Sequence, residues 1–341
     1  MVASLLILYG FLLVVRVGNA LLMPRLNRGG AGAKLVFCVP CRNEAHNLPE
    51  CLAHLGPHVL VFDDESTDGT ADVARALGVQ VISPHEALPQ GWTGKNRACH
   101  ELALAALETD AEWVVFLDAD TVAGPDFAER LSATLGAAKE TVATGFLRMR
   151  PGAGWEPVYL AWVFWIVLAS NPFFLVHLTR RGHNGFLNGQ FVAWRREMLT
   201  EHRPYEQVRG EILEDVILGR WLARQRIPVL CLNVASSLSV QMYTNLSDAV
   251  PGMLKNSHAI AGRGSLLLAL FMLFVAWAWV VDWRVALVAF AALIGWPSRD
   301  QGPVAARLLM PLSLTAGAIT ILLSRRLKRQ GRLTWKGRTY S

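Results

Sequence analysis

Apolar and polar positions alternate along residues 35–117 in a pattern that predicts strands and helices in turn. Short continuous apolar runs predict strands, and the mixed segments between them predict helices. The strands are expected at 35–39, 59–62, 79–82 and 113–117, and the helices at 47–55, 70–77 and 95–107. A short apolar run between turn residues is typical of a strand that is buried on both faces. The alternation therefore predicts an α/β fold with a mainly parallel sheet covered by helices.

Longer apolar segments lie at both ends of the chain. Ser4–Leu22 is apolar apart from Arg16 and Asn19, and its length is close to the roughly twenty residues that a spanning helix needs. It lacks a charged leading region and a clear small-residue cleavage site, so we expect an uncleaved membrane anchor over 1–24. Three further apolar blocks predict a C-terminal transmembrane region over 265–324. They are Ser265–Val281, Val285–Trp296 and Val304–Ser324.

Another apolar stretch, residues 155–178, lies in the middle of the chain and is rich in Trp and Phe. A spanning helix here would put the acidic residues at 118–120 and at 214–215 on opposite sides of a membrane. If these residues form one site, the stretch lies in the membrane interface, where aromatic side chains are enriched. A buried helix of the globular domain is the alternative, because a broken apolar run is also typical of a core helix.

Charge and composition narrow the function classes. The 341 residues are 52% hydrophobic, with a net charge of +6, and the mean hydropathy is +0.31. Residues 325–341 contain seven Lys and Arg and no acidic residue, so the rest of the chain is close to neutral. A positive charge confined to one tail does not indicate a nucleic-acid partner. Basic residues are enriched on the cytoplasmic side of membrane segments.

These charges predict a topology. We expect the basic tail and the catalytic domain in the cytoplasm, in a multi-pass protein of the cell (inner) membrane that contacts membrane lipids. Three full C-terminal spans would place the tail outside. We therefore expect one block, Val285–Trp296, to be re-entrant or interfacial.

The most informative motif is the apolar run at 113–117, which ends in Asp118 and Asp120. In an open α/β sheet the ligand lies just beyond the carboxyl ends of the strands. Two carboxylates placed there suit Mg²⁺ or Mn²⁺ carrying a substrate diphosphate. The alternative is a strand end followed by a turn, since turn residues come directly after the pair.

Four further segments place polar residues after a strand or at the start of a helix: Val39–Glu44, Phe62–Thr70, Gly91–Asn96 and Glu211–Arg220. With the Asp pair, they resemble in order the P-x-x-N-E, D-D-x-S-x-D-G-T, G-K, D-x-D and E-D motifs of the family 2 glycosyltransferases. The resemblance covers roughly residues 34–232 and implies a Rossmann-like GT-A catalytic domain, which we expect over 34–262. The Gly91–Lys95 and Trp335–Tyr340 segments are most similar to a membrane-bound branch that glycosylates carotenoids and related polyisoprenoid lipids.

The resemblance implies a nucleoside site made by two loops. Pro40, Asn43 and Glu44 are expected to form the loop over the nucleoside, and Glu44 is expected to hold the ribose hydroxyls. Asp63 is expected to contact the base. Asp64 is the neighbouring carboxylate to test for the same contact.

The resemblance also implies a diphosphate and metal site. Lys95 is expected near the base and diphosphate, Asp118 near the nucleotide sugar, and Asp120, with Asp118, as a ligand of Mn²⁺ or Mg²⁺. Processive members carry a Q-x-x-R-W motif after the acidic pair, and this sequence has none. That departure predicts a single transfer rather than polymer extrusion. It leaves Lys255 as the candidate diphosphate contact in the corresponding region.

On the acceptor side, Asp215 resembles the family's catalytic base, and Glu214 is expected to orient it or to bind the acceptor. The alternative for this pair is a negatively charged first helical turn, which the helix dipole favours. Asn188 and Gln190 are expected to contact the sugar or the acceptor, with a strand-turn role as the equal alternative. A lone histidine is more often structural, so His183 is not included in the predicted site.

Together these features predict an inverting, non-processive glycosyltransferase. It would move a hexose from a nucleotide donor such as UDP-glucose to a hydroxyl of a hydrophobic lipid such as a carotenoid. A polyprenyl-phosphate acceptor is one alternative, and a non-catalytic membrane scaffold with a degenerate transferase domain is another. A transporter is disfavoured by the few apolar segments and the large polar middle of the chain.

Overall fold

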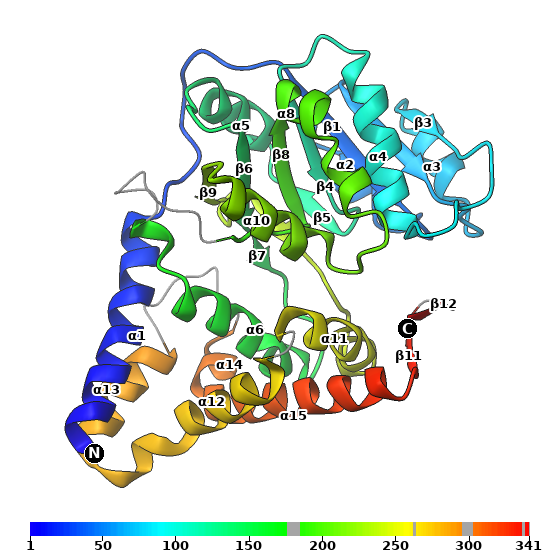
Figure 1. The fold of residues 1–341 in the computed structure, drawn as a ribbon. Helices are drawn as coiled ribbons and strands as arrows, with labels where there is room; N and C mark the ends of the chain where they lie inside the picture. Colours follow the sequence, from blue (N-terminus) through cyan, green and yellow to red (C-terminus); the bar gives the residue numbers. More distant parts are fainter. Residues whose placement is uncertain (176–184, 262–263, 295–302, 336–337, 341) are drawn as a thin grey trace. The chain divides into compact units, whose positions relative to one another are not determined.

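The computed structural model describes residues 1–175, 185–261, 264–294, 303–335 and 338–340 (Figure 1). The chain divides into two compact units. The first, here the α/β unit, comprises Pro24–Arg148 and Leu175–Val240. The second, here the helical unit, comprises Met1–Met23, Met149–Phe174 and Gln241–Ser341. This grouping joins 149–174 and the segment after 240 to the terminal helices, whereas we predicted one domain over 34–262. The predicted domain boundaries stay a prediction.

The α/β unit is built around a seven-stranded sheet with the order β3-β2-β1-β4-β8-β6-β9. Strand β8 runs antiparallel to both of its neighbours, and the other pairs are parallel. The strands are β1 (Leu35–Cys41), β2 (Val59–Asp63), β3 (Gln80–Ile82), β4 (Trp113–Leu117), β6 (Val142–Phe146), β8 (Phe191–Arg195) and β9 (Val229–Asn233). The predicted α/β class with a mainly parallel sheet is confirmed, and the four strands predicted from apolar runs are all present.

Helices and short strands complete the α/β unit. The helices are α2 (Leu48–Leu52), α3 (Thr70–Ala76), α4 (Gly94–Leu107), α5 (Phe127–Gly136), α8 (Arg196–His202), α9 (Pro204–Gln207) and α10 (Glu214–Gln225). The short strands β5 (Thr121–Ala123) and β10 (Leu238–Val240) pair antiparallel, and β7 (Arg148–Met149) lies at the boundary of the unit. Strands β2, β4 and β6 are buried at every position, so both faces of the sheet are covered there. Burial of each large apolar side chain stabilises the fold by about 1.5–3 kcal/mol.

One edge of the sheet collects the loops that carry the sequence motifs. Strands β1, β2 and β4 are parallel, so their carboxyl ends lie at the same edge. Strand β8 starts at this edge because it is antiparallel to β4, with Phe191 opposite Leu117. The backbone N–H of Asp118 donates to Gln190 O at 3.3 Å. The loops after β1, β2 and β4 and the segment before β8 therefore meet.

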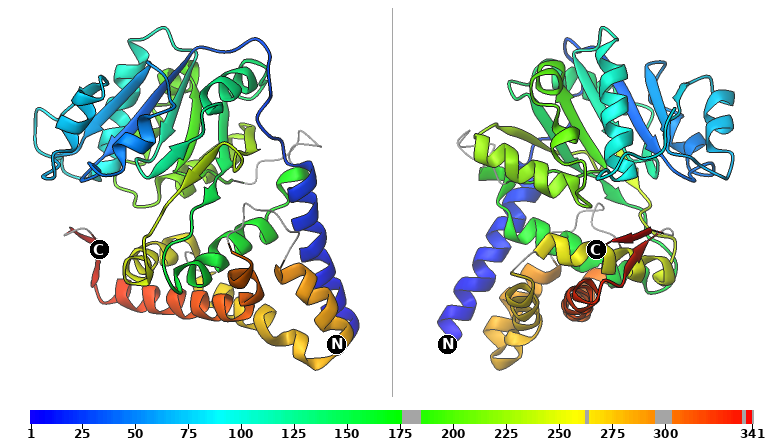
Figure 2. Two further views of the ribbon diagram at one scale, coloured as in Figure 1. Left: turned by 180° about the vertical axis from the view of Figure 1, so that it is seen from behind. Right: turned by 45° about the vertical axis from the view of Figure 1, so that its right-hand side comes forward.

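The helical unit contains α1 (Val2–Leu22), α6 (Glu156–Ser170), α11 (Leu246–Ala261), α12 (Ser265–Trp277), the 3₁₀ helix η2 (Ala278–Val281), α13 (Trp283–Ile294), α14 (Val304–Leu308) and α15 (Met310–Arg329). A short hairpin of β11 (Leu333–Trp335) and β12 (Arg338–Tyr340) follows α15. Within this unit α1 packs along α13, and α15 packs against α6, α11 and α12 (Figure 2).

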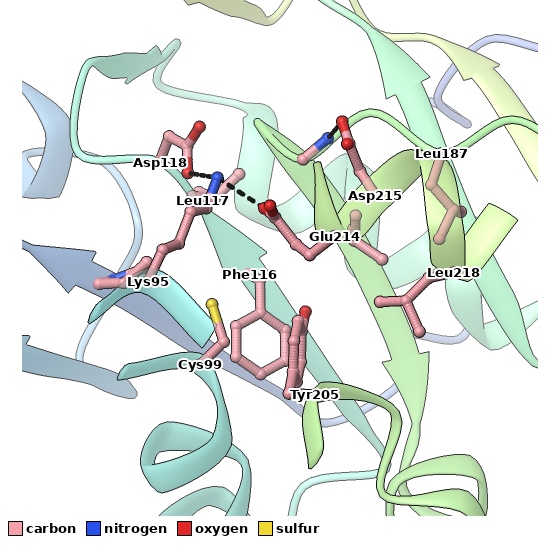
Figure 3. Close-up of a pocket in the computed structure, with 13 residues that line it drawn as sticks. Lys95, Cys99, Phe116, Leu117, Asp118, Leu187, Tyr205, Glu214, Asp215 and Leu218 are labelled. Atoms are coloured by element: carbon pink, nitrogen blue, oxygen red, sulfur yellow. Dashed lines mark hydrogen bonds and ion pairs between the residues drawn. The ribbon is translucent and has the colours of Figure 1, made fainter. Parts of the chain in front are cut away.

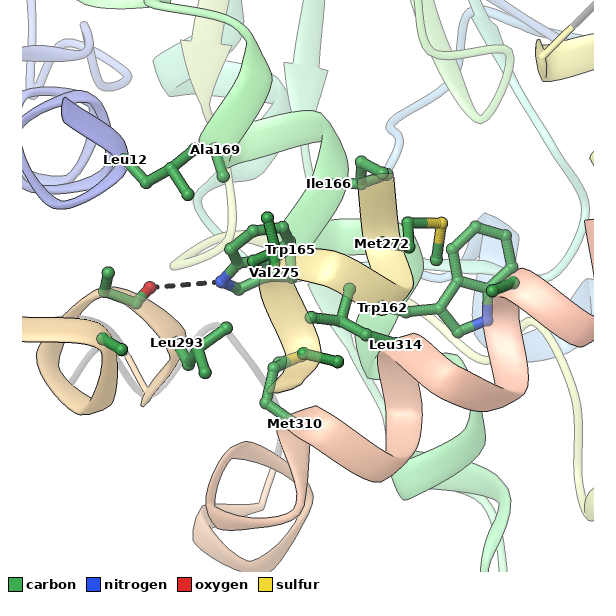
Figure 4. Packing of buried hydrophobic residues seen from close by; sticks show 14 of the residues in the cluster. Leu12, Trp162, Trp165, Ile166, Ala169, Met272, Val275, Leu293, Met310 and Leu314 are labelled. Atoms are coloured by element: carbon green, nitrogen blue, oxygen red, sulfur yellow. Dashed lines mark hydrogen bonds between the residues drawn. The ribbon is translucent and has the colours of Figure 1, made fainter. Parts of the chain in front are cut away.

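Polar side chains inside the helical unit donate to backbone carbonyls of neighbouring helices, and Figure 4 shows this for Trp165. Trp165 Nε1 and Arg16 Nη1 both donate to Ala292 O, each at 3.1 Å. Tyr9 Oη donates to Val275 O at 2.6 Å. Buried polar groups are costly unless they are hydrogen-bonded, so these bonds fix how the helices pack against one another.

Two helices among the described residues are long and apolar enough to cross a membrane, judged by length and composition alone. They are Val2–Leu22, which coincides with the predicted anchor, and Glu156–Leu175, which coincides with the predicted interfacial stretch as far as it is described. The apolar helices Ser265–Val281 and Trp283–Ile294 are shorter than a typical span of about 20 residues. The helical unit is compatible with membrane association, and the multi-pass arrangement stays a prediction.

Candidate active site

Charged side chains from three separate parts of the sequence meet at the carboxyl edge of the sheet (Figure 3). Lys95 comes from the first turn of α4, Asp118 follows β4, and Glu214 and Asp215 are the first two residues of α10. These four residues line one pocket with Gly189, which precedes β8. The structure therefore brings together four residues that the sequence predicted as one site.

Helix starts position two parts of this cluster. Thr93 caps α4, because its Oγ1 accepts a hydrogen bond from Asn96 N at 3.2 Å. This cap fixes the first turn, from which Lys95 reaches the sheet edge. Helix α10 begins at Glu214, so the acidic pair occupies the turn where the helix dipole favours negative charge. The acidic pair therefore occupies the first helical turn, as in the alternative that we weighed. Glu214 also contacts Lys95 from this position.

Lys95 links the carboxylate that follows β4 to the first carboxylate of α10. Its Nζ lies 2.8 Å from Asp118 Oδ1 and 3.0 Å from Glu214 Oε1. Burial lowers the pKa of Lys95, but the two carboxylates outweigh burial and hold that pKa well above its usual value. Burial raises the pKa of Asp118, and the charge of Lys95 opposes this increase. A permanently charged ammonium group therefore lies between two acidic residues that are 96 positions apart in the sequence.

Asp215 points toward the segment before β8. Its Oδ2 accepts a hydrogen bond from Gly189 N at 3.0 Å, and its Oδ1 accepts one from Val216 N at 2.8 Å. Burial, with the negative charge of Glu214 beside it, raises the pKa of Asp215 to about 6. Lys95 and the two backbone N–H groups oppose this increase. A carboxylate with this pKa is ionised near neutral pH and still binds a proton more readily than an ordinary Asp.

Asp120 has a different environment from Asp118. Its Oδ1 is buried and has no hydrogen-bond partner among the described residues. Burial, with the negative charges of Asp118 and Glu44 nearby, raises the pKa of Asp120 to about 8. A buried carboxylate oxygen without a donor is costly, so this oxygen is suited to an added cation.

The donor set fits a divalent metal only if the substrate also contributes ligands. Among the described residues, no group of three or more His, Cys, Asp and Glu side chains is arranged to hold a metal ion. Mg²⁺ in particular is usually held by one or two carboxylates together with substrate phosphates and waters. Asp120, with its unpartnered oxygen, and Asp118 match this requirement.

The two predicted nucleoside loops are fastened to each other by hydrogen bonds. Asn43, which has a φ of 57°, donates from its backbone to Ser66 Oγ at 2.9 Å and accepts Thr67 N at its Oδ1 at 2.8 Å. Glu44 N donates to Thr70 Oγ1 at 2.9 Å. Asparagine tolerates this left-handed backbone better than most residues. Asn43 therefore shapes the loop with both its backbone and its side chain.

The neighbouring carboxylates Asp63 and Asp64 differ in their partners. Asp64 Oδ1 lies 2.5 Å from Arg97 Nη2, and its Oδ2 lies 3.3 Å from Arg42 Nη1. Asp63 Oδ2 accepts Ser66 N at 3.4 Å, while its buried Oδ1 has no hydrogen-bond partner in the described part of the chain. Asp64 is thus tied into the fold by two arginines, whereas Asp63 presents an oxygen that can accept a ligand N–H.

The predicted acceptor residues Asn188 and Gln190 take part in the turn before β8. Asn188 Nδ2 donates to Gly145 O at 3.0 Å, and its Oδ1 accepts Gln190 N at 3.2 Å. Gln190 is only 8% exposed. These bonds support the strand-turn alternative for Asn188, because both ends of its amide are engaged.

Pro40 and Lys255 were also predicted, and His183 was considered but left out. Pro40 lines the pocket with Lys95. Lys255 belongs to α11 of the helical unit, and its role as a diphosphate contact stays a prediction. His183 falls outside the described residues.

Sequence reasoning missed Asn96, which follows Lys95 directly. Its side chain is fully buried, and its Nδ2 donates to the carbonyls of Val208, Arg209 and Glu211 at 2.5, 3.2 and 2.9 Å. These carbonyls belong to the loop that leads into α10. Asn96 therefore fastens the acidic helix to the helix that carries Lys95. A polar residue in the first turn of α4 was the available signal, but its partner loop lies more than 100 residues away.

The sheet order and the charged edge are those of a glycosyltransferase of the GT-A fold. The mannosyltransferase PcManGT from Pyrobaculum calidifontis, solved in complex with GDP-Man and Mn²⁺, is similar in fold, with a TM-score of 0.54 and 14% identity. The match covers 96% of this chain and 99% of that chain. At this identity, the similarity supports the fold alone.

A sequence model of the family described as glycosyltransferase like family 2 matches residues 33–248. The chain belongs to this family. A 4,4′-diaponeurosporenoate glycosyltransferase of Staphylococcus haemolyticus (strain JCSC1435) is 24% identical over 250 residues, 70% of this chain. An uncharacterized glycosyltransferase of Mycobacterium tuberculosis (strain ATCC 25618 / H37Rv) is 36% identical over 141 residues, 41% of this chain. The matched regions span 64% and 59% of the lengths of these two relatives.

Proposed function

We propose that this protein is a membrane-associated, inverting glycosyltransferase that moves one sugar from a nucleotide donor to a hydroxyl of a hydrophobic lipid. The observation that carries the proposal is the sheet-edge cluster, in which Lys95 joins Asp118 to Glu214 and Asp215 stands beside them. A family 2 chain that retains these groups in contact has the parts that sugar transfer needs. A degenerate scaffold has no need of all of them together.

The nucleotide lies against the loops after β1 and β2. Asp63 is the better candidate for the base contact, because its Oδ1 is buried without a partner among the described residues while Asp64 is held by Arg97. Asn43 shapes the loop from inside, and Glu44 faces the ribose. We propose a uridine donor, whose uracil N–H the unpaired carboxylate oxygen of Asp63 can accept.

The diphosphate lies beside β4. Asp120 and Asp118 would hold Mn²⁺ or Mg²⁺ there, and Lys95 supplies a second positive charge 2.8 Å from Asp118. A bound divalent ion would neutralise the charge that builds on the departing diphosphate, which is worth several kcal/mol. Lys255 is retained as a candidate for a further contact with the diphosphate.

Asp215 is the proposed general base. The acceptor hydroxyl oxygen forms a bond to the anomeric carbon while the bond from that carbon to the diphosphate oxygen breaks. The hydroxyl proton passes to Asp215, and the electron pair leaves with the nucleoside diphosphate. A pKa near 6 keeps Asp215 ionised at neutral pH and matches it to the operating pH better than an ordinary Asp. Glu214, held by Lys95, orients this end of α10.

A lipid acceptor is supported by the surface of the helical unit. Its outward side chains on α12 are Leu266, Leu267, Leu270, Phe271, Phe274 and Trp277. On α1 they include Ile7, Phe11 and Val14. Apolar faces of this size suit lipid rather than water. The relative from Staphylococcus haemolyticus is named for a carotenoid acid, so a carotenoid-like polyisoprenoid is the acceptor class we propose.

Helix α6 is the proposed interfacial element. Strand β6 precedes it and strand β8 follows it, and these two strands pair in one sheet. A helix that crossed the membrane once would leave its two flanks on opposite sides. Helix α6 therefore lies in the interface and returns the chain to the same side, while α1 crosses. The multi-pass arrangement of the C-terminal helices is part of this proposal.

The test uses the purified full chain in detergent or lipid vesicles, with Mn²⁺ and a lipid extract. Release of free nucleoside diphosphate is measured for UDP-glucose and GDP-mannose, and lipids are analysed by mass spectrometry. We expect release that depends on lipid and metal, with a hexose added to a lipid hydroxyl. Transfer to a phosphate instead, unaffected by Asp215→Asn, would favour the polyprenyl-phosphate acceptor. Absence of binding to any nucleotide sugar would contradict the enzyme and favour the scaffold.

A further inference from the structure

Gly189 lies among three charged groups of the candidate site. A Cβ added at this position would lie 3.2 Å from Asp215 Oδ2, 3.2 Å from Glu214 Oε1 and 3.4 Å from Lys95 Nζ. Two of these separations are tighter than ordinary van der Waals contact, so any side chain here would displace at least one carboxylate. A side chain at residue 189 would therefore meet charged groups from both α4 and α10.

The backbone conformation does not explain the glycine. Other glycines of this unit, such as Gly69 and Gly78, have positive φ values of 84° and 78°, which favour glycine. Gly189 is not among the positive-φ residues of the described chain. A residue with a side chain can adopt this backbone. The crowded surroundings of position 189 therefore explain why it is a glycine.

The N–H of Gly189 is held in a fixed direction. Asn188 N donates to Thr144 Oγ1 at 2.9 Å, and Phe191 N donates to Asn188 O at 3.0 Å, so the turn is fastened to β6 and continues into β8. From this turn Gly189 N donates to Asp215 Oδ2 at 3.0 Å. A hydrogen-bond donor fixed by the central sheet can orient a side chain that comes from a separate helix.

We propose that Gly189 is a positioning residue for Asp215. Its N–H orients the carboxylate, and its missing side chain keeps open the space in which an acceptor hydroxyl approaches. The inference rests on the proposed role of Asp215 as the general base. It adds a backbone N–H to the groups that support the reaction. This N–H acts through Asp215 and not on the bond of the substrate that breaks.

The direct test is Gly189→Ala, which keeps the N–H and adds the Cβ. We expect kcat to fall by about 3- to 10-fold, because the carboxylates must shift by a few tenths of an ångström and a misplacement of about 1 Å can cost about 10²-fold. The KM for the nucleotide sugar should change little. Gly29→Ala is the matched control, since a Cβ there meets no atom of the described residues within 4 Å.

The pH profile separates positioning from a general structural defect. The N–H of Gly189 and the charge of Lys95 favour ionised Asp215, whereas burial and Glu214 disfavour it. Pushing the carboxylate away from the N–H removes one stabilising contact. The lower pH midpoint of kcat should therefore move upward in Gly189→Ala and stay unchanged in Gly29→Ala.

A double variant shows whether the effect passes through Asp215. In an Asp215→Asn background, adding Gly189→Ala should cause little further loss of residual transfer, because coupled residues are not additive. If Asp215→Asn loses transfer but Gly189→Ala keeps wild-type kcat and pH midpoint, this inference is wrong and the base assignment stands. If Asp215→Asn itself keeps wild-type transfer to a hydroxyl, the proposed function is wrong.

Discussion

The two units of this chain differ in how many large apolar side chains they expose. All but three of the exposed large apolar side chains in the described residues belong to the helical unit. The three exceptions, Leu77, Leu104 and Leu175, are scattered over the α/β unit. Inside the helical unit, polar groups such as Tyr9 and Arg16 bond to helix carbonyls.

Under the proposed function, this difference corresponds to two surroundings, water and lipid. A unit with buried apolar strands and charged edges suits water, whereas one with large outward apolar faces suits lipid. A reaction between a water-soluble nucleotide sugar and a lipid needs both surfaces in one chain. The predictions below test this division, from the largest expected effect to the smallest.

The largest effect is expected for Asp120→Ala, which removes a buried carboxylate oxygen that has no partner among the described residues. Turnover should fall by about 10³-fold or more, since a metal contributes several kcal/mol to such a reaction. Metal-dependent binding of the nucleotide sugar should be lost as well. Asp110→Ala is the control, because Asp110 is an exposed residue paired with Lys34. Equal losses in both variants would contradict a specific role for Asp120.

Asp215→Asn should have the next largest effect. Donor binding should be kept, while transfer to a hydroxyl should fall by about 10²- to 10⁴-fold, the usual contribution of a general base. Binding is measured by equilibrium titration and transfer by labelled lipid product. Parallel loss of donor binding and transfer would instead assign Asp215 to the donor site.

The pH dependence follows from the same residue. Asp215 must be ionised to accept a proton, and its pKa is raised to about 6. The kcat/KM should therefore fall as the pH drops below about 6, by about tenfold per pH unit. The measurement is a pH series from 8 to 5 on the wild type. A flat profile through this range would exclude Asp215 as the titrating base.

Asn96→Ala should have a smaller effect on turnover. It removes the Nδ2 donor that the carbonyls of Val208, Arg209 and Glu211 share, and it leaves the buried Val208 carbonyl without this bond, which should cost about 1–3 kcal/mol of unfolding free energy. Turnover should fall by about tenfold as α10 loosens from α4. Asn27→Ala is the control, because Asn27 Nδ2 makes one long bond of 3.5 Å to Ala133 O. Unchanged thermal unfolding and turnover would contradict this role for Asn96.

The smallest effect is expected when one exposed leucine of the helical unit is compared with one of the α/β unit. Leu267 in the helical unit is 74% exposed, and Leu104 in the α/β unit is 40% exposed. Each is replaced by Cys, and labelling by a water-soluble maleimide is followed in vesicles. All five native cysteines are buried. Leu104→Cys should label several-fold faster, because lipid covers the other site. Faster labelling of Leu267→Cys would contradict a lipid-facing α12.

Much of the α/β unit follows from local sequence. Strand β4 coincides with the apolar run at 113–117, and the motif residues Lys95, Asp118, Glu214 and Asp215 meet as expected. Parallel strands bring their carboxyl ends together whatever the loops do, so a pattern of apolar runs is enough to predict the shared edge.

Other features depend on contacts that no local pattern contains. Asn96 bonds to a loop 112–115 residues away, and Gly189 is explained only by what surrounds it. Asp63 and Asp64 differ because Arg97 pairs with Asp64, and the sequence of their loop does not show this pairing. The grouping of residues 149–174 with the terminal helices rests on contacts such as that of Trp165 with Ala292.

The most direct test of the account is equilibrium binding of a labelled nucleotide sugar to the wild-type full chain, with and without Mn²⁺. UDP-glucose is the first ligand, and Asp120→Ala is measured beside the wild type. We predict saturable binding that requires the metal and disappears in the variant. Wild-type protein that binds no nucleotide sugar in the presence of Mn²⁺ would contradict the account.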